Sequence, residues 1–175
     1  LMEATYLSDD PTYTRLFSVQ SNRLYPFIDR VCYRLPDCIQ AQGGLGLHID
    51  NRPRLDLGEL KKWRPIQGFV ALTDHFSAEH GGLKVVRGFH RQFDDFFRDY
   101  DGPVEAGEFF RMNSVKYAKL QKQCQFVYAP AGSLVCWDNH IPHATCDVLS
   151  GNDSREVVYA SFLPDCELNR HYAQD

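Results

Sequence analysis

The sequence predicts a mainly β domain, an antiparallel sandwich or barrel with flanking helices. Short apolar runs recur from Asp37 onward, and turn sequences such as Gly-Gly at 81–82 and Ser-Gly-Asn-Asp at 150–153 interrupt them. The segment Ala-Pro-Ala-Gly at 129–132 joins two such runs and is typical of a hairpin turn. The chain has 175 residues, of which 13% are aromatic, which is enough for one aromatic-rich core. We therefore expect a single domain over residues 1–175.

The expected strands share three features: they are short, they are rich in apolar residues, and Gly, Pro, Asn or Asp residues bound them. In chain order they are 37–42, 45–50, 66–73, 82–86, 124–129, 133–137 and 155–163. No internal repeat or low-complexity segment interrupts this series.

Two segments outside this series predict helices. Residues 8–30 mix polar and apolar side chains, which predicts one or two short helices in an N-terminal helical flank over residues 1–36. Residues 88–123 predict a helical insertion in the sheet. Its aromatic side chains recur at three- and four-residue spacing, as on one helix face: Phe93, Phe96, Phe97 and Tyr100. We expect this aromatic stripe to serve packing rather than substrate recognition.

The bulk composition excludes some partners and points to a compartment. With 19 basic and 23 acidic residues the net charge is −4, so no basic field of the kind that binds nucleic acid is expected. No apolar run approaches the roughly 18 residues of a membrane span, and the polar, acidic start is not a signal peptide. The six cysteines form no CxxC pair and are interpreted as free thiols in a reducing compartment. We expect a cytoplasmic protein, and the oligomeric state is left open.

The triplet His48-Ile49-Asp50 predicts a metal site. In an extended strand, side chains at i and i+2 point to one face, so His48 and Asp50 can present an imidazole and a carboxylate to one ion. A further histidine from a distant strand, with His143 preferred, would complete a set of two histidines and one carboxylate. That set is the ligand arrangement of non-heme Fe(II) oxygenases and leaves coordination positions open.

Three segments carry a resemblance to a known family. They are GLGLHIDN around the triplet, GGLKVVRGFHR at 81–91, and AGSLVCWDNHIPHAT at 131–145, and Arg155 follows them. In this order they resemble the phytanoyl-CoA dioxygenase-like branch of the Fe(II)/2-oxoglutarate oxygenases, over roughly residues 40–163. The middle segment departs from the family, because Arg-Gly-Phe-His at 87–90 stands where Pro-Gly-Ser-His is usual.

The resemblance implies a fold, a ligand set and a reaction. The implied fold is a double-stranded β-helix, a jelly-roll of the cupin-like kind. Fe(II) would bind His48, Asp50 and His143 as the catalytic centre, with 2-oxoglutarate and O2 as cosubstrates. Arg155 would hold the distal carboxylate of 2-oxoglutarate. The implied reaction hydroxylates a small molecule or metabolite and releases succinate and CO2. Asp50 favours hydroxylation, because related halogenases have a small residue at this position.

Other cosubstrate contacts are hypotheses from position. Strand alternation places Tyr159 and Ser161 on the same face as Arg155, so either residue could line the cosubstrate pocket. Gln42 precedes the metal triplet and either contacts cosubstrate or substrate or faces solvent.

His140 competes with His143 for the role of distal ligand. His143 is preferred, because it stands before Ala144 and about a dozen residues before Arg155, as in the family. Asp138 or Asn139 is a candidate partner for the second ring nitrogen of the ligand.

Two other readings stay open. The first is a jelly-roll metalloenzyme that uses Zn or Mn without 2-oxoglutarate, since ligand types alone do not decide the metal. The second is a binding module that keeps the fold without catalysis. The substrate itself cannot be predicted from these patterns.

Overall fold

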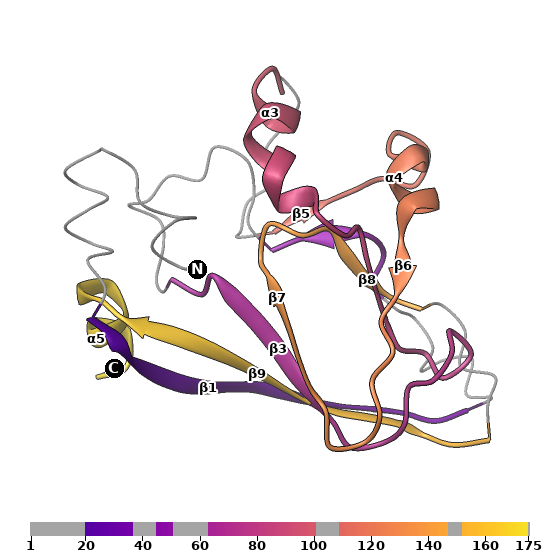
Figure 1. Ribbon diagram of the computed structural model, residues 1–175, viewed down its shortest axis with the longest axis horizontal. Helices are drawn as coiled ribbons and strands as arrows, with labels where there is room; N and C mark the ends of the chain where they lie inside the picture. Colours follow the sequence, from indigo (N-terminus) through magenta and orange to yellow (C-terminus); the bar gives the residue numbers. More distant parts are fainter. Residues whose placement is uncertain (1–19, 37–44, 51–62, 101–108, 147–151, 175) are drawn as a thin grey trace.

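The computed structural model of the chain describes residues 20–36, 45–50, 63–100, 109–146 and 152–174. The described part is built mainly from two antiparallel sheets (Figure 1). The four-stranded sheet has the order β1-β9-β3-β7. Its strands are β1 (Gln20–Arg34), β9 (Arg155–Asp165), β3 (Ile66–Ala71) and β7 (Leu134–Asp138).

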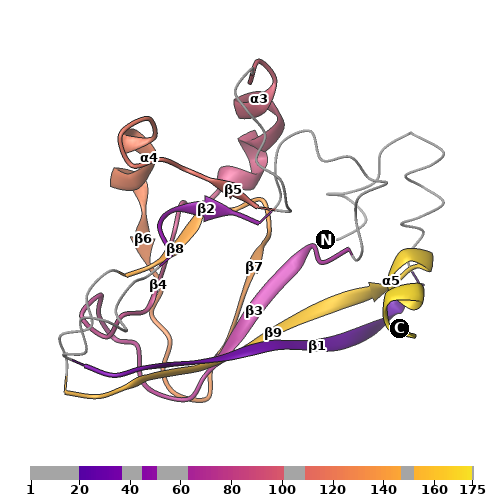
Figure 2. The same ribbon diagram turned by 180° about the vertical axis from the view of Figure 1, so that it is seen from behind.

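The second sheet has five short strands in the order β5-β2-β8-β4-β6. They are β5 (Phe110–Arg111), β2 (His48–Ile49), β8 (His143–Thr145), β4 (Leu83–Val85) and β6 (Gln125–Phe126). Figures 1 and 2 show the long strands β1 and β9 side by side along one edge of the molecule, with β2, β5 and β8 on the opposite side. Neighbours in both sheets are distant in sequence, so the topology brings remote residues together.

The prediction of an N-terminal helical flank over residues 1–36 is wrong for the residues that the structure describes in this range. Gln20–Arg34 is a strand that pairs with β9 along most of its length. The register shifts twice, between Gln20 and Leu24 and between Ile28 and Arg30. Such irregularities break the two-residue alternation, and the apolar residues then resemble a helical pattern. Residues 1–19 lie outside the described residues.

Most expected strands are present with shifted ends. Strands β3, β4, β6, β7 and β9 each lie within or largely overlap a predicted segment. In the segment 45–50, only His48–Ile49 is a strand. The predicted strand 37–42 lies outside the described residues.

The segment 88–123 is only partly helical. It contains a 3₁₀ turn, η3 (Phe89–Gln92), and two short helices, α3 (Phe93–Phe97) and α4 (Ala118–Gln123). Between them, β5 adds an edge strand to β2, because pairing Phe110 with Ile49 buries its ring. A third helix, α5 (Glu167–Tyr172), follows β9.

Two apolar clusters hold these layers together. One cluster lies between the smaller sheet and helices α3 and α4, and includes Phe93, Phe97, Phe110 and Leu120. The aromatic stripe of α3 therefore contributes to packing, as expected. The other cluster includes Phe69, Leu83, Trp137 and Val157, which come from both sheets. Two of its members, Leu83 and Trp137, line the pocket described below.

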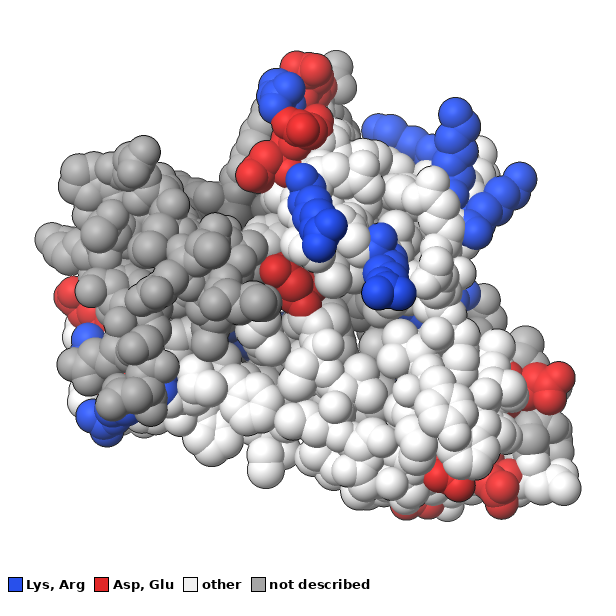
Figure 3. All heavy atoms as spheres, viewed as in Figure 1, with Lys and Arg blue, Asp and Glu red and all other residues white. Residues whose placement is uncertain are grey.

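The described surface carries charges of both signs. Figure 3 shows acidic side chains on α3 and basic side chains around the neighbouring α4. The five described cysteines, Cys32, Cys124, Cys136, Cys146 and Cys166, are free thiols. Among the helices of the described part, none has the length and apolar character needed to cross a membrane.

Candidate metal centre

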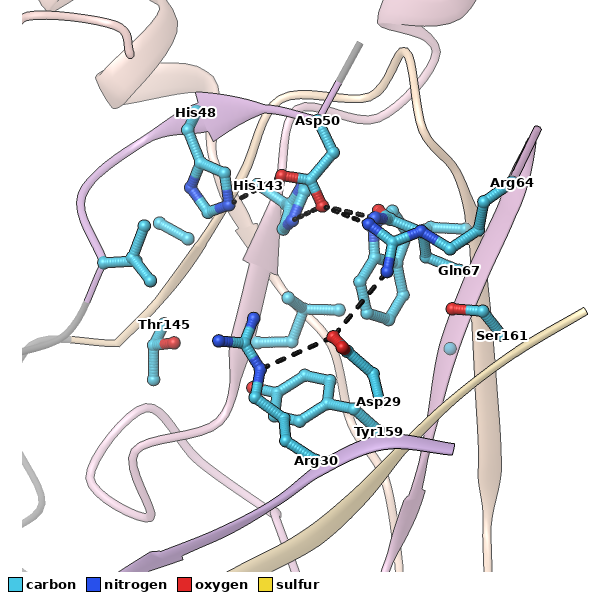
Figure 4. Close-up of a pocket in the computed structure, with 15 residues that line it drawn as sticks. Asp29, Arg30, His48, Asp50, Arg64, Gln67, His143, Thr145, Tyr159 and Ser161 are labelled. Atoms are coloured by element: carbon cyan, nitrogen blue, oxygen red, sulfur yellow. Dashed lines mark hydrogen bonds and ion pairs between the residues drawn. The ribbon is translucent and has the colours of Figure 1, made fainter. Parts of the chain in front are cut away.

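The two histidines of the candidate site face each other across a strand pair. His48 on β2 and His143 on β8 are direct partners in the antiparallel register. Their ring centroids lie 4.3 Å apart. Asp50 follows β2 at two residues from His48, and its carboxylate reaches the same space (Figure 4). The sheet thus joins ligands from opposite ends of the chain.

The ligand atoms are close enough to hold one ion. Nε2 of His48 lies 3.4 Å from Oδ1 of Asp50, and Nε2 of His143 lies 3.9 Å from Oδ2. One ligand atom from each of the three residues can be chosen so that all lie within 4.8 Å of one another. Ligand atoms about 2.1 Å from an ion, at right angles, would be about 3 Å apart. A small inward movement of these side chains would therefore satisfy a metal ion.

Backbone carbonyls orient both imidazoles. Nδ1 of His48 lies 2.8 Å from the carbonyl oxygen of Gly46, and Nδ1 of His143 lies 2.9 Å from that of Ile141. A carbonyl can only accept, so each Nδ1 carries the proton and donates it. In the neutral form of either ring, the lone pair is then on Nε2, the atom that faces Asp50. Such outer contacts set the tautomer and the ring orientation of metal ligands.

Two side chains hold Asp50 from the other side. The Gln67 amide on β3 donates a hydrogen bond to Oδ2 of Asp50. The guanidinium of Arg64 lies 3.7 Å from the same oxygen and 3.6 Å from Oδ2 of Asp29 (Figure 4). Asp50 is therefore positioned by the larger sheet, while the histidines come from the smaller one.

The surroundings favour the protonation states that a metal requires. Burial by itself would raise the pKa of Asp50, but the two histidines, the Gln67 hydrogen bond and Arg64 outweigh it and lower the pKa. Burial, then the neighbouring His48, lowers the pKa of His143 to about 4, against the opposing effect of Asp50. Near neutral pH the site therefore offers a carboxylate and a neutral imidazole, the forms that bind metals.

A pocket opens beside these ligands. Tyr159 and Ser161 on β9, which were predicted as cosubstrate contacts, are among the residues that line it. Thr145, two residues beyond His143, and Trp137 on β7 also line it. The ring of Trp137 lies 5.2 Å from that of His143. Gln42 lies outside the described residues.

Arg155 does not line this pocket, although it starts the same strand. Its side chain is fully buried. Its guanidinium contacts the Cys32 thiol at 3.4 Å and lies 5.8 Å from the ring centre of Phe69. Phe69 in turn contacts Tyr159 and Trp137, which do line the pocket. Arg155 thus adjoins the pocket through one aromatic side chain.

Asp138 interacts with His140 and was also a candidate partner for the ring of His143. Asp138 accepts a hydrogen bond from the His140 backbone and lies 2.9 Å from Nδ1 of its ring. The side chain of Asn139 donates to the Arg64 carbonyl oxygen. The suggested role of Asp138 or Asn139 as partner of the ligand ring is therefore wrong, because the Ile141 carbonyl takes that role.

Sequence reasoning missed the side chains that position Asp50. Gln67 lies inside a predicted strand, two residues before Phe69 on the inward face, and a polar residue at such a position was the available signal. Arg64 precedes that strand and carries no local pattern that predicts its contact with Asp50. Asp29 and Arg30 also border the pocket, and both lie on β1, where helix was expected.

The comparisons with known proteins identify the fold. No family model matches the sequence, and no curated protein matches it. The crystal structure of GIG2 (DUF1479) from Candida albicans has a TM-score of 0.71 at 16% identity, covering 90% of this chain and 47% of that one. The hypothetical protein JW0805 from Escherichia coli gives 0.68 at 18% identity, with 98% and 57% covered.

A third structure contains ligands. HygX from Streptomyces hygroscopicus, with nickel, 2-oxoglutarate and hygromycin B bound, has a TM-score of 0.50 at 19% identity, covering 82% of this chain and 56% of that one. This chain spans about half the length of these proteins. It has their β-rich fold, which in HygX accompanies a metal ion and 2-oxoglutarate. These likenesses establish the fold, and the neighbours do not single out the phytanoyl-CoA branch.

Proposed function

We propose that this chain is the catalytic domain of an Fe(II)/2-oxoglutarate-dependent oxygenase with a double-stranded β-helix (jelly-roll) fold. It would hydroxylate a small molecule or metabolite and release succinate and CO2. Its sequence motifs favour the phytanoyl-CoA dioxygenase-like branch. The observation that carries the proposal is the group of His48, Asp50 and His143, which are preset in orientation at the edge of a pocket.

The ligand types and their arrangement fit iron. Two neutral imidazoles and one carboxylate on one side of an ion leave its other side for small molecules. When bound, the iron and 2-oxoglutarate would supply the electrons that activate O2, which is the oxidant. Asp50 is retained, which supports hydroxylation rather than halogenation.

The buried guanidinium fits the second carboxylate of 2-oxoglutarate. Arg155 forms no ion pair with any described residue, and its Nε has no hydrogen-bond partner there. A buried cation without a counter-ion is costly, so an anionic ligand would relieve that cost. Tyr159 and Ser161 lie on the same strand face and would hold the cosubstrate on its way to the metal, and Gln42 stays a proposed contact.

The protein's own side chains would position the reactants. The carbonyls of Gly46 and Ile141 hold the imidazoles, and Gln67 and Arg64 hold Asp50 ionised. Trp137 and Leu83 form an apolar part of the pocket wall. Asp29, Arg30 and Arg64 form a charged border, which we propose contacts polar groups of the substrate.

Anaerobic titration tests the proposal. Adding Fe(II) and then 2-oxoglutarate should produce a visible metal-to-ligand charge-transfer band in the wild type. His48→Ala and Asp50→Ala should abolish it by removing metal ligands. Arg155→Ala should weaken 2-oxoglutarate binding while retaining the metal. The exposed Arg98, which follows the end of α3, is the control, and Arg98→Ala should change neither.

Each outcome separates this function from the alternatives. Metal binding without a charge-transfer band would favour an enzyme that does not use 2-oxoglutarate. If neither metal nor 2-oxoglutarate binds, the chain is a binding module that keeps only the fold.

A further inference from the structure

Both ring nitrogens of His75 and Nε of Arg155 are among the buried side-chain atoms that have no hydrogen-bond partner within the described part of the chain. His75 is 0% exposed and Arg155 is 1% exposed, so water does not reach them from the surface. Buried polar atoms are nearly always paired, and an unpaired one is strongly unfavourable. Two such side chains at one place point to a missing partner.

The side chains of His75 and Arg155 both contact the ring of Phe69. The His75 ring lies 5.9 Å from that of Phe69, and the Arg155 guanidinium lies 5.8 Å from its centre. The chain around His75 is held firmly, since its backbone exchanges two hydrogen bonds with Ala129, at 2.8 and 3.0 Å. The Phe69 ring also contacts Tyr159 and Trp137, which line the metal pocket. The Phe69 ring therefore links the two side chains with unpaired nitrogens to residues that line the pocket.

The charge states of His75 and Arg155 favour an anionic ligand. Burial, and then the charge of Arg155, lowers the pKa of His75 to about 4, so the imidazole is neutral near pH 7. A neutral imidazole offers one N–H, and the guanidinium offers its unpaired N–H and a positive charge. A cation would be repelled here, and an uncharged ligand would leave the guanidinium without a counter-ion. A carboxylate accepts from both donors and neutralises the charge.

We infer that His75 is a second donor to the distal carboxylate of the 2-oxo acid, beside Arg155, and that it helps to select a dicarboxylic cosubstrate. The inference rests on the proposed function, because it assumes that the 2-oxo acid binds at the metal. It adds a binding residue from the segment between β3 and β4, whereas the other proposed contacts lie on β9 or precede β2.

The test compares two 2-oxo acids on the nickel-loaded protein by calorimetry. 2-Oxoglutarate and 2-oxobutyrate carry the same metal-chelating end, and only 2-oxoglutarate carries the distal carboxylate. His75→Leu should weaken 2-oxoglutarate binding about ten- to hundredfold, as expected for losing a hydrogen bond to a charged group. The affinity for 2-oxobutyrate should stay the same. His75→Gln, which keeps an N–H donor, should recover part of the loss, and the surface variant His171→Leu should leave both affinities unchanged.

A thermal readout separates binding from structure. If His75 only fills space, His75→Leu removes an unpaired polar group and should raise the melting temperature equally with and without 2-oxoglutarate. The inference instead requires that 2-oxoglutarate stabilise the variant less than the wild type. Should the leucine variant fail to fold, the comparison of His75→Gln with His75→Asn decides, because a different reach must then change the preference for 2-oxoglutarate.

The outcomes distinguish the two levels of the argument. If the wild type binds neither 2-oxo acid, the proposed function is wrong and this inference falls with it. If both acids bind and the His75 variants keep the wild-type preference, only the role of His75 is wrong.

Discussion

Each residue of the candidate centre is held by a second contact. The ligand imidazoles donate to the carbonyls of Gly46 and Ile141, and Asp50 accepts from Gln67. These contacts fix which atoms face the ion before any ion binds, so less order must be imposed on binding. Preorganisation at this scale is the reason to regard the group as a metal site rather than a chance cluster.

Removing the Gln67 amide should weaken metal binding. In Gln67→Leu, Asp50 loses a hydrogen bond that favours its ionised form and fixes its orientation. We expect about a 10- to 100-fold lower affinity for Ni(II), measured by calorimetry. Gln125→Leu, an exposed glutamine on β6, serves as the control. Equal affinity in both variants would show that Gln67 does not support the site.

At the scale of elements, β3 is an inner strand of the larger sheet and is packed closely between its two neighbours. It lies between β9 and β7, and Gly68 is paired with Ala160 on one side and Cys136 on the other. A Cβ atom at Gly68 would come within 2.7 Å of the Val135 carbonyl oxygen and 3.2 Å of the Ala160 carbonyl oxygen. Both are backbone atoms of paired strands, so they cannot move aside without disturbing the sheet.

Gly68→Ala should therefore destabilise the protein by about 1–3 kcal/mol, the usual effect of overpacking. Thermal or urea unfolding of the metal-free protein measures this change. Gly46→Ala is the matched control, because nothing lies within 4 Å of its new Cβ. Similar melting temperatures for the two variants would show that β7 and β9 can separate to admit a methyl group.

The elements also explain which predictions from sequence failed. Strands β3, β7 and β9 are continuous runs with turns at both ends, and local patterns predicted them well. β1 is an edge strand with two register shifts and contains Pro26, which is tolerated there because an edge strand need not donate on both sides. Its alternation is broken, so its apolar spacing indicated helix. Strand β5 is too short for any local pattern and exists only because β2 pairs with it.

At the scale of the whole molecule, the fold buries histidines in neutral form. The pKa of His75 and that of His143 are each lowered to about 4, in both cases mainly by burial. The ordinary histidine pKa is about 6.5, so between these values the unfolded chain binds more protons than the folded one. Stability from these groups is therefore complete above about pH 6.5 and is lost as the pH falls toward 4.

Urea unfolding of the metal-free protein at several pH values checks this expectation. The midpoint should fall between pH 6.5 and 4.5, by an amount that corresponds to about 1–3 kcal/mol per histidine. His75→Leu should reduce the pH dependence while keeping the contribution of His143. Asp50 acts with the same sign but only below its ordinary pKa of 3.8, because its folded pKa is lowered. A midpoint that stays constant across this range would contradict neutral burial of both rings.

The sequence by itself determined the mainly β class, most strands of the larger sheet, and the pairing of His48 with Asp50 on one face. These features depend on local alternation and on residue type, and short segments of the sequence contain that information. His143 was predicted as the third ligand from its place in a motif. Only the tertiary structure decided that β2 and β8 pair in the register that sets His48 opposite His143.

Further contacts also depend on the tertiary structure. Gln67 and Arg64 contact Asp50, and the carbonyl of Ile141, rather than Asp138, accepts from the His143 ring. His75 and Arg155 both contact Phe69. The physical reason is the same in each case. These contacts join residues from different strands or loops, and the antiparallel register that sets their distances depends on the packing of the whole chain rather than on any one segment.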